Sequence, residues 1–580
     1  MNNVDFKIKQ GRVALSVYVA YIRAAGLGMF LTVIVLFMIF PATGMMTSYW
    51  LVYWSEDKLG WAQYEYVAVY ALIALGSIVS IMFRQLFRTI LAVKAAKTMH
   101  EDLLQSVARA PLSFFHTTPA GRILNRFSSD QSTIDENFFN SFCGVFRNFF
   151  KLVATLIVIV AANPIFAAFI IPIAWVYFKI NAFYMTSNRE VKRLESISRS
   201  PVYSHFSETL QGAVTVRAYR RSDSFFKEHI KRLDGNTAAL FISNALSAWL
   251  RLYCQGVIGG TIMFVTASLG VLGDGDPAIT GMAMQYAFQV IWGLAFFVMN
   301  VTQVEAQAVS LERIAEYSNL TPEEPTVKPL PPSNWPQTGE IEWDRMGLRY
   351  RKGLPPALRN VTCTIKDGEK VGICGRTGAG KSSMTVGLLR LADEIFGSIK
   401  IDGVDHASIR MSALRSKLAL IPQEATMFAG DIRLNLDPLE EETDAELWQC
   451  LRQVELEEAV KDAGGLTATV AEDGNNWSQG QRQLLCIARA LLKRSRVVML
   501  DEATASCDVT TDAMVQKVVR DVFTGCTVLT IAHRLHTIAD SDKIMVLDQG
   551  AVVEFDSPQN LLSREGSIYR SLVEESEKSH

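Results

Sequence analysis

Long runs without any Asp, Glu, Lys or Arg fill much of the first half of the chain. They cover residues 26–55, 66–83, 152–178, 252–273 and 278–304. A helix needs about 20 apolar residues to cross the hydrocarbon core of a bilayer. The third run is broken by Asn163-Pro164, which predicts two helices that meet at a tight turn. The runs therefore predict six membrane-spanning helices, because buried helices of a soluble protein seldom lack charge over such lengths.

Basic residues indicate how these helices are oriented. Lys and Arg are frequent at the N-terminus, after the second run and from Asn188 onward, whereas the connections 56–61 and 273–278 carry only Lys58. Cytoplasmic connections of membrane proteins are enriched in Lys and Arg. The N-terminus and the two basic segments are therefore expected in the cytosol, as is everything that follows the sixth span.

The two basic segments mix charged and apolar residues at helical spacing, so the membrane helices are expected to continue beyond the bilayer. Loops at 112–130 and 200–219, which are rich in aromatic and apolar residues, are expected to interrupt these extensions and to act as docking elements. After the sixth span, residues 318–339 hold a cluster of prolines, which predicts an extended tether between two domains.

Composition narrows the classes of function. The net charge of −2 gives no general attraction to nucleic acid, which we do not expect as a partner. The 8 cysteines are scattered, without a C-x-x-C pair, which argues against a disulfide framework or a zinc site. The first residues are polar and charged, unlike a secretory signal peptide.

The second half of the chain contains a phosphate-binding motif. Residues 375–382 fit G-x-x-x-x-G-K-[ST], after a strand pattern at 370–374 and before an apolar helix pattern. Glycines let backbone amides close around phosphate oxygens, and the start of the helix adds partial positive charge. In such a loop Lys381 reaches the outer phosphates and the Ser382 hydroxyl ligates Mg²⁺. The predicted ATP-binding residues are Tyr350, Gly375, Arg376, Thr377, Gly378, Ala379, Gly380, Lys381, Ser382 and Ser383.

Further strand ends are expected to complete this site. The buried strand pattern 497–500 runs into Asp501, which can hold Mg²⁺, and Glu502, which can orient or deprotonate the attacking water. His533 ends another strand pattern and is expected to reach the γ-phosphate, while Gln423 can ligate Mg²⁺ or water. Tyr350 offers a ring for adenine, although an aromatic residue there can equally belong to the core. The predicted catalytic residues are thus Glu502, His533 and Gln423, and the Mg²⁺ ligands are Ser382, Gln423 and Asp501.

Taken in order, these residues resemble an ATP-binding-cassette transporter. The likeness rests on "LRYR", "GRTGAGKSS", Gln423, "WSQGQRQ", "VVMLDE" and His533, and it covers nearly the whole chain. "LALIPQEATMFAGDIRLNLDP" and "SFFHTTPAGRILNRFSSD" are similar to the C-terminal half of subfamily C, the multidrug-resistance-associated group. The resemblance implies an all-α six-helix transmembrane domain of the type IV exporter fold, followed by an α/β P-loop ATPase domain with a helical subdomain.

The resemblance also implies how the chain is divided and with what it assembles. The expected parts are a cytosolic N-terminus with an elbow helix (1–25), a transmembrane domain (26–317), the linker (318–339) and the ATPase domain (340–580). Such proteins pair two membrane domains and two ATPase domains, with two ATP molecules bound between the latter. The partner would be an N-terminal half in the same or a separate chain, or a second copy of this chain.

The signature segment of this family, Leu-Ser-Gly-Gly-Gln, is altered. The five residues are Trp477, Ser478, Gln479, Gly480 and Gln481. In the family the signature serine and glycine contact the nucleotide of the partner, so residues 478–481 are expected to serve the partner's site. Trp477 and Gln479 are then expected to report on how that partner works. The loop 506–508 also departs from the family pattern, although Asp508 is kept.

The most economical hypothesis is an ATP-driven exporter, a translocase that hydrolyses ATP to move amphipathic or xenobiotic solutes. A nucleotide-sensing channel regulator, like the sulfonylurea receptors, is the alternative, whereas six spans exclude a soluble ATPase. Trp292 and Phe296 of the sixth span and Arg251 of the fifth are the candidate residues of the substrate pathway. The expected place is the plasma membrane or a vacuole- or lysosome-type membrane, with the ATPase domain in the cytosol.

Overall fold

The computed structural model describes residues 14–272, 276–324, 328–501, 509–532 and 534–578. The chain divides into two compact units, one of residues 1–108 and 120–320 and the other of residues 109–119 and 321–580. We call them the helical unit and the ATPase unit, and each is described by itself.

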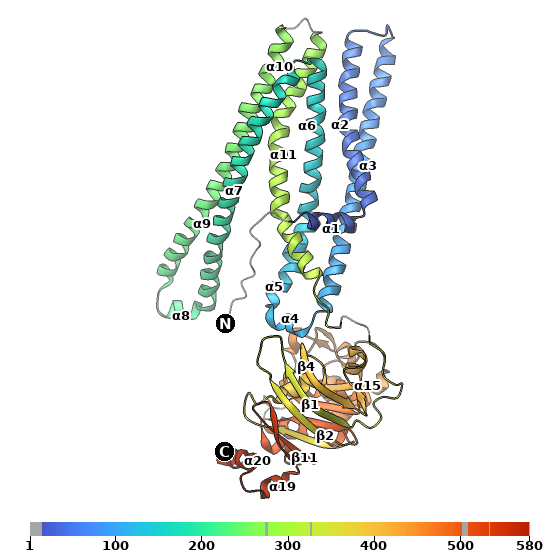
Figure 1. The fold of residues 1–580 in the computed structure, drawn as a ribbon, viewed down its shortest axis with the longest axis vertical. Coiled ribbons are helices and arrows are strands. Elements are labelled where there is room, and N and C mark those ends of the chain that lie inside the picture. Colours follow the sequence, from blue (N-terminus) through green and yellow to red (C-terminus); the bar gives the residue numbers. More distant parts are fainter. Residues whose placement is uncertain (1–13, 273–275, 325–327, 502–508, 533, 579–580) are drawn as a thin grey trace. The chain divides into compact units, whose positions relative to one another are not determined.

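The helical unit is built from long helices that pack in pairs (Figure 1). Its elements are α1 (Leu15–Ala25), α2 (Leu27–Ser55), α3 (Gln63–Ala108), α5 (Ala120–Asn125), η1 (Arg126–Asp130), η2 (Thr133–Phe138), α6 (Phe139–Ala162), α7 (Phe166–Gln211), α8 (Ala213–Ala218), α9 (Ser222–Arg251), η3 (Leu252–Gly259), α10 (Gly260–Leu272) and α11 (Pro277–Ser318). The main pairs are α2 with α3, α6 with α11, and α7 with α9.

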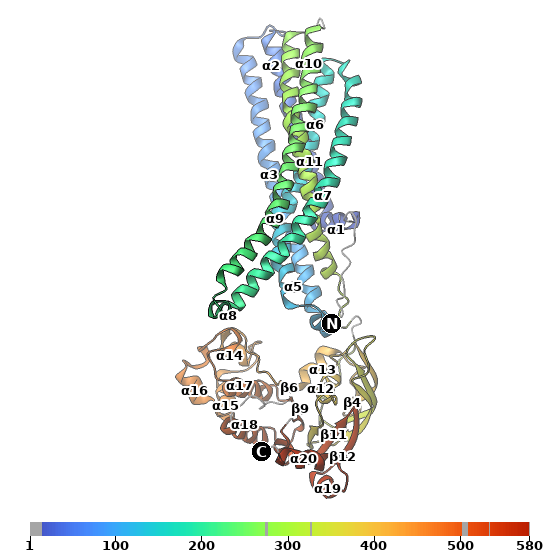
Figure 2. The ribbon, with the colours of Figure 1, turned by 90° about the vertical axis from the view of Figure 1, so that its left-hand side faces the viewer.

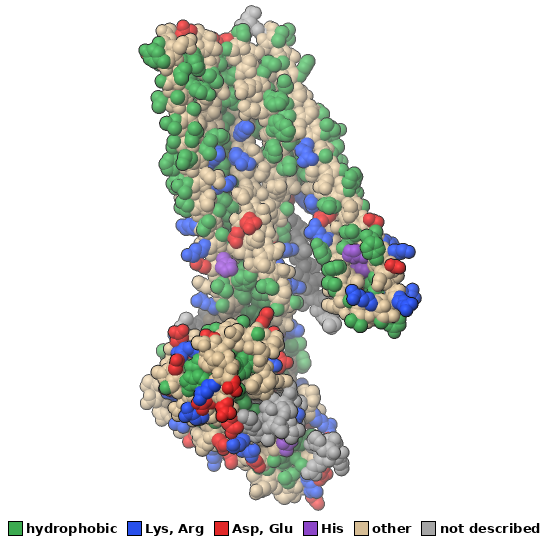
Figure 3. Space-filling model, turned by 180° about the vertical axis from the view of Figure 1, so that it is seen from behind, with side chains coloured by type: hydrophobic (Ala, Val, Ile, Leu, Met, Phe, Trp, Pro, Cys, Tyr) green, Lys and Arg blue, Asp and Glu red, His purple; other side chains and the backbone are tan. Residues whose placement is uncertain are grey.

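The six predicted spans are confirmed. Six helical stretches among the described residues are long and apolar enough to cross a membrane: 27–55, 63–108, 120–162, 166–211, 222–272 and 277–318. The turn at Asn163-Pro164 separates α6 from α7, as expected from the sequence. Figure 3 shows apolar side chains over one end of this unit, with Lys and Arg side chains appearing further along the helices. That division agrees with helices that leave the bilayer on one side.

Short helix α1 lies across the direction of α2 and α3 (Figure 1). Gly26 separates α1 from α2 with a φ of 96°, a backbone conformation that only glycine adopts readily. Leu15 at the start of α1 is exposed, whereas Tyr21 and Ala25 are buried against the bundle. The position fits the expected elbow helix, of which residues 1–13 lie outside the described part.

The two expected cytosolic loops are shorter than the sequence suggested. Within 112–130 the chain forms α4 (Leu112–Thr117), and the helix resumes at Ala120, directly after Pro119. Within 200–219, α7 continues through Pro201 as far as Gln211, and only α8 and its flanking turns interrupt the path to α9. Helix α7 packs along α9 (Figure 2), and Arg232 and Asn236 of α9 donate hydrogen bonds to the α7 carbonyls of Pro201 and Glu195.

The ATPase unit contains two larger sheets. One has the strand order β2-β1-β4-β5 and the other β12-β11-β3-β10-β9-β6. The strands are β1 (Ile341–Arg349), β2 (Leu358–Ile365), β3 (Lys370–Cys374), β4 (Glu394–Ile401), β5 (Val404–Asp405), β6 (Leu418–Ile421), β9 (Val497–Asp501), β10 (Thr527–Ile531), β11 (Lys543–Asp548) and β12 (Ala551–Asp556), with a small pair β7 (Gly430–Asp431) and β8 (Thr469–Val470). Strands β11, β3, β10, β9 and β6 are parallel, so their carboxyl ends share one edge.

Helices surround the sheets and form a separate helical lobe. They are α12 (Lys381–Leu388), α13 (Met411–Lys417), α14 (Ile432–Leu436), α15 (Asp444–Gln453), α16 (Glu457–Asp462), α17 (Gln479–Leu492), α18 (Val509–Val522), α19 (Pro558–Ser563) and α20 (Ile568–Lys578). One hydrophobic core lies between the two sheets and α12, and a second joins α14 to α18. The P-loop belongs to the first core and the signature segment to the second.

The last part of the linker, from Lys328 to Gly339, packs on the ATPase unit instead of forming a free tether. Trp335 is only 4% exposed, and its indole N–H donates to the carbonyl of Ile401 at 2.8 Å. The Asp402 carboxylate accepts hydrogen bonds from the backbone N–H groups of residues 337–340. The prolines exclude helix and strand, as expected, but they do not prevent the indole from entering the core.

Candidate nucleotide-binding site

The P-loop lies between β3 and α12, at the shared edge of the parallel strands. Gly375, Gly378 and Gly380 have φ values of 148°, 85° and 99°. A Cβ at Gly375 would lie 2.2 Å from the Leu547 carbonyl oxygen, and one at Gly380 would lie 2.9 Å from that of Ala357. Backbone conformation therefore favours glycine at all three positions, and space also requires it at Gly375 and Gly380.

Lys381 is the first residue of α12 and is 6% exposed. Its ammonium group donates to the carbonyl oxygens of Gly375 at 2.7 Å and Arg376 at 3.3 Å, so it lies over the loop. The cation thus stands beside the N-terminus of a helix, where backbone amides also point outward. Both features favour an anionic group such as phosphate.

Oxygen ligands meet beside the same helix. The Ser382 hydroxyl donates to the Asp501 carboxylate at 3.3 Å, which brings together the residues after β3 and at the end of β9. A hydroxyl and a carboxylate are the hard oxygen donors that Mg²⁺ prefers. Gln423 is exposed and follows β6 at the same edge. The donor set therefore fits a magnesium ion that is shared with a phosphate.

Two predicted catalytic residues, Glu502 and His533, lie outside the described residues. Their neighbours are defined: β9 ends at Asp501, and β10 ends at Ile531 beside both β3 and β9. Tyr350 donates or accepts a hydrogen bond with Ser383 at 2.9 Å, and its ring packs against the sheet core. The core role of Tyr350 thus has geometric support, and the adenine contact stays a prediction.

The signature segment forms the beginning of α17. Ser478 is the N-cap: its hydroxyl accepts from the Gln481 N–H, and the Gln481 side chain accepts from the Ser478 N–H. This reciprocal pair is a capping box, which fixes the start of a helix. The helix begins at Gln479, and Gln481 belongs to its cap.

Trp477, which precedes the cap, is buried in the helical lobe, although the sequence placed it in a surface that faces the partner. It is 7% exposed and packs into the core of the helical lobe. Its Nε1 is buried without a hydrogen-bond partner among the described residues. The residue that replaces the family's leucine therefore has a packing role in this lobe, and its relation to the partner's nucleotide stays a prediction. Ser478 and Gln479 are exposed beside it.

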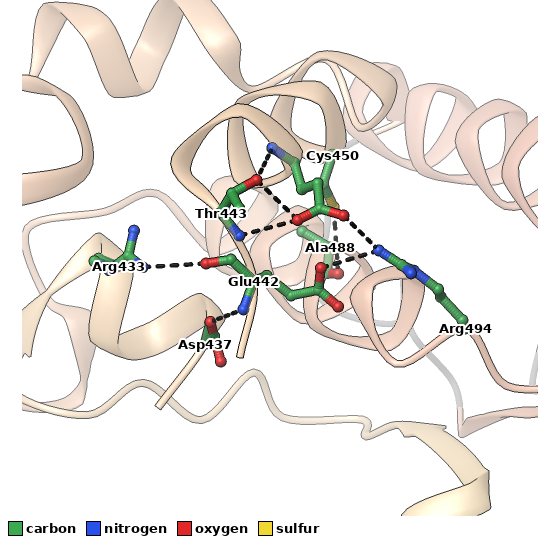
Figure 4. Close-up of polar contacts among 8 residues, drawn as sticks. Arg433, Asp437, Glu442, Thr443, Cys450, Ala488 and Arg494 are labelled. Atoms are coloured by element: carbon green, nitrogen blue, oxygen red, sulfur yellow. Dashed lines mark hydrogen bonds and ion pairs between the residues drawn. The ribbon is translucent and has the colours of Figure 1, made fainter. Parts of the chain in front are cut away.

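The other end of α17 is anchored by an ion-pair cluster (Figure 4). Arg494 donates to the carboxylates of Glu442 and Glu446, each at 2.9 Å. Glu446 also completes a capping box with Thr443 at the start of α15. Hydrogen bonds from Thr443, and then from Arg494, lower the pKa of Glu446 to about 2. The cluster joins the end of the signature helix to the rest of the helical lobe.

The predicted pathway residues fall on different helices. Trp292 and Phe296 of α11 are 52% and 48% exposed, and their rings stack with centroids 6.4 Å apart. Arg251 is exposed at the end of α9.

Arg84 belongs to the basic segment after the second run, and the sequence did not mark it as a candidate residue of the substrate pathway. Its guanidinium lies over the rings of Phe37 and Phe40 of α2, at 5.4 and 4.5 Å. One of its terminal nitrogens is buried without a hydrogen-bond partner among the described residues. The signal in the sequence was its position directly after the run 66–83.

Two family models match the chain, in the order that the fold shows. Residues 24–294 match the ABC transporter transmembrane region, and residues 358–505 match the model described as ABC transporter. The chain belongs to the ATP-binding-cassette transporters, with a multi-pass membrane region followed by an ATPase region.

Similar proteins carry names of this family. The ATP-binding cassette transporter abc2 of Schizosaccharomyces pombe is 42% identical over 98% of this chain and 39% of its own length. The ATP-binding cassette sub-family C member 2 of Mus musculus is 39% identical over 97% of this chain and 37% of its length. The vacuolar heme ABC transmembrane exporter abc3 of S. pombe is 39% identical over 99% of the chain and 40% of its length. The chain thus spans about two fifths of the curated relatives that it matches.

Proposed function

We propose that this chain is one half of an exporter that is driven by ATP hydrolysis and assembles with a second ABC half. The observation that carries the proposal is the division of the ATPase unit. A complete P-loop with Lys381, Ser382 and Asp501 stands on the sheet core, whereas the capped signature helix stands on the helical core. One chain thus offers a phosphate site and, on another lobe, a signature segment, which is the arrangement that two facing ATPase domains need.

The roles of the site residues follow from their positions. The loop 375–380 and Lys381 bind the phosphates of ATP, and Ser382 with Asp501 and Gln423 would hold Mg²⁺. A bound Mg²⁺ supplies charge neutralisation at the β- and γ-phosphates. Glu502 follows Asp501 directly and orients the attacking water, while His533 holds the γ-phosphate. The ring of Tyr350 contacts the adenine of ATP in this proposal.

The signature residues 478–481 serve the nucleotide of the partner half. The Ser478 cap pairs the Gln481 amide and fixes the start of α17, and the exposed Gln479 side chain alters the surface there. We infer that the ATP bound by Lys381 is hydrolysed with the help of Glu502, and that the partner's ATP, which faces the altered signature, turns over slowly.

The cargo is an amphipathic solute that carries negative charge. Trp292 and Phe296 offer exposed aromatic surface on α11, and Arg84 brings a guanidinium with a buried unpaired nitrogen among the helices. A charge inside a membrane bundle is costly and marks pathways for ions or substrates. Together these groups suit a solute with both an apolar body and an anionic group.

Replacement of Glu502 by Gln tests the proposed hydrolysis. The chain and its partner half are reconstituted in proteoliposomes, and phosphate release is measured with saturating Mg-ATP. Glu502→Gln is expected to abolish turnover while Mg-ATP still binds, because Gln keeps the shape but cannot act as a base. Glu458→Gln, on an exposed position of α16, is the matched control. Turnover near that of the control would show that Glu502 is not the catalytic group.

Replacement of Arg84 tests the proposed cargo. Vesicle uptake is compared for a carboxylated fluorescent dye and its neutral methyl ester. Arg84→Gln is expected to reduce uptake of the carboxylate about fivefold or more and that of the ester much less, and Arg84→Lys is expected to restore part of it. Lys97→Gln, at an exposed position of α3, controls for the general loss of a positive charge. Equal losses for dye and ester would refute an anionic cargo.

A further inference from the structure

Arg415 of α13 caps the helix that begins at the P-loop. Its Nε donates to the Leu389 carbonyl at 3.0 Å, and one terminal nitrogen donates to the Arg390 carbonyl at 2.9 Å. These carbonyls directly follow α12, where the last peptide groups of a helix lack partners and carry negative partial charge. The guanidinium therefore fixes the end of α12 that lies opposite the phosphate-binding end.

The same guanidinium is paired with the linker. Its two terminal nitrogens donate to the two Glu323 carboxylate oxygens at 2.8 and 2.7 Å, and the side chains are only 29% and 22% exposed. The N–H of Glu323 in turn donates to the Arg109 carbonyl at 2.7 Å, in the segment 109–119 of the same unit. Glu323 thus ties both the linker and this segment to the cap of α12.

The signature helix ends at Arg415 as well. Lys493, the C-cap of α17, donates to the carbonyl oxygens of Arg415 and Leu418, each at 2.7 Å. Arg415 therefore contacts the C-terminal ends of the two helices whose N-terminal ends carry the P-loop and the signature segment. Its position joins the two cores of the ATPase unit with the segment that follows α11.

We propose that Arg415 is a positioning residue for the nucleotide site and that Glu323 links it to the linker, so that ATP binding and linker position influence each other. The proposal rests on the ATPase function proposed above. Four hydrogen bonds use the planar guanidinium, and Lys could not make them, because its ammonium has three donors on a single nitrogen. Coupling between two sites is reciprocal, so a change that ATP causes in α12 must also appear in the linker.

Hydrogen exchange and Mg-ATP titration of the full chain in lipid nanodiscs test this link. In the wild-type chain, Mg-ATP is expected to slow amide exchange in peptide 318–324 by about fivefold or more, the lower end of ordinary allosteric coupling. Glu323→Ala is expected to abolish that response while α12 stays protected by Mg-ATP. Arg415→Met is expected to abolish it too and to weaken Mg-ATP binding about fivefold, and the double variant is expected to equal Arg415→Met, because the two residues act as a unit.

Lys328→Met is the matched control, since Lys328 anchors the same linker by donating to the Ala407 carbonyl at 2.6 Å and has no bond to Arg415. Glu323→Gln is a milder second variant, which keeps the side-chain shape and is expected to lose most of the response. A wild-type response in both Glu323 variants would overturn the proposal, as would an equal loss in Lys328→Met. If the wild-type chain binds no Mg-ATP, the proposed function fails; if it binds Mg-ATP without any linker response, only the present proposal fails.

Discussion

Replacement of Trp477 separates a packing role from a role at the partner's nucleotide. The indole is 7% exposed in the core of the helical lobe, and its Nε1 is buried without a hydrogen-bond partner among the described residues. Truncation of a buried Trp to Ala costs about 3–5 kcal/mol, through lost burial and the cavity left behind. This substitution also removes the unpaired N–H and regains about 1–3 kcal/mol, so Trp477→Ala is expected to destabilise the ATPase unit by about 2 kcal/mol.

Trp477→Leu, which restores the residue usual in the family, is expected to behave differently. A buried Leu recovers about 2–3 kcal/mol of the lost burial, which leaves a deficit of about 1–2 kcal/mol. Removal of the unpaired N–H returns about 1–3 kcal/mol, the cost of a buried donor without an acceptor. The two effects nearly cancel, so the stability of Trp477→Leu should lie within about 1 kcal/mol of the wild type.

Differential scanning calorimetry of the full chain in nanodiscs measures both variants. The transition of the ATPase unit is recognised by its rise with added Mg-ATP, since a ligand stabilises only the unit that binds it. Trp477→Ala is expected to lower its Tm by roughly 4–8 °C and Trp477→Leu by less than about 4 °C. A Trp477→Leu loss as large as that of Trp477→Ala would refute the reasoning, because the indole N–H would then make a bond that Leu cannot replace.

Three further substitutions address the loop, the cap and the linker. Gly375→Ala puts a Cβ 2.2 Å from the Leu547 carbonyl oxygen and should weaken binding of a fluorescent ATP analogue about tenfold or more; unchanged binding would contradict the geometry. Ser478→Ala removes the cap shared with Gln481 and should cost about 1 kcal/mol, seen as a fall of roughly 2–4 °C in the same calorimetric transition. Burial alone would raise the pKa of Asp402, but hydrogen bonds from the linker lower it below its ordinary value, so its contribution is present above about pH 4 and is lost as the pH falls through the lowered pKa. The Tm difference between wild type and Asp402→Asn should therefore shrink between about pH 5 and pH 3, and a constant difference would show that the carboxylate charge is not what holds the linker.

The membrane-spanning helices were predictable, because a run without charged residues that is long enough to cross a bilayer can be read directly from the sequence. The ends of the helices were harder, as Pro201 shows. Proline removes one hydrogen bond from its own helix, but packing of α7 along α9 outweighs that loss, and the partner residues in α9 are distant in sequence. Arg84 was hard to place for a related reason, since its contacts with Phe37 and Phe40 of α2 depend on how α2 packs on α3.

The nucleotide site was predictable from local patterns, because each of its parts stands at the end of one strand or the start of one helix. Parallel pairing of β3 with β10 and of β10 with β9 then brings those ends together without further information. The signature segment was only partly predictable. The capping box of Ser478 and Gln481 is local, whereas burial of Trp477 depends on how α14, α15 and α18 close around it.

Arg415 lies beyond such reasoning, since Glu323 and Arg415 are 92 positions apart and neither belongs to a motif that binds phosphate. Pairs of oppositely charged residues at that separation are common in any chain. Nothing in the sequence indicates that this pair meets at the end of α12. What distinguishes this pair is that the guanidinium also donates to the two carbonyl oxygens that follow α12, while the Arg415 carbonyl accepts a hydrogen bond from Lys493 of α17. A linker that was attached only by an exposed ion pair would be bound weakly to the ATPase unit. A linker that is anchored to the cap of α12 can shift the phosphate site at the other end of that helix. The coupling is therefore expected at Glu323 and not at Lys328.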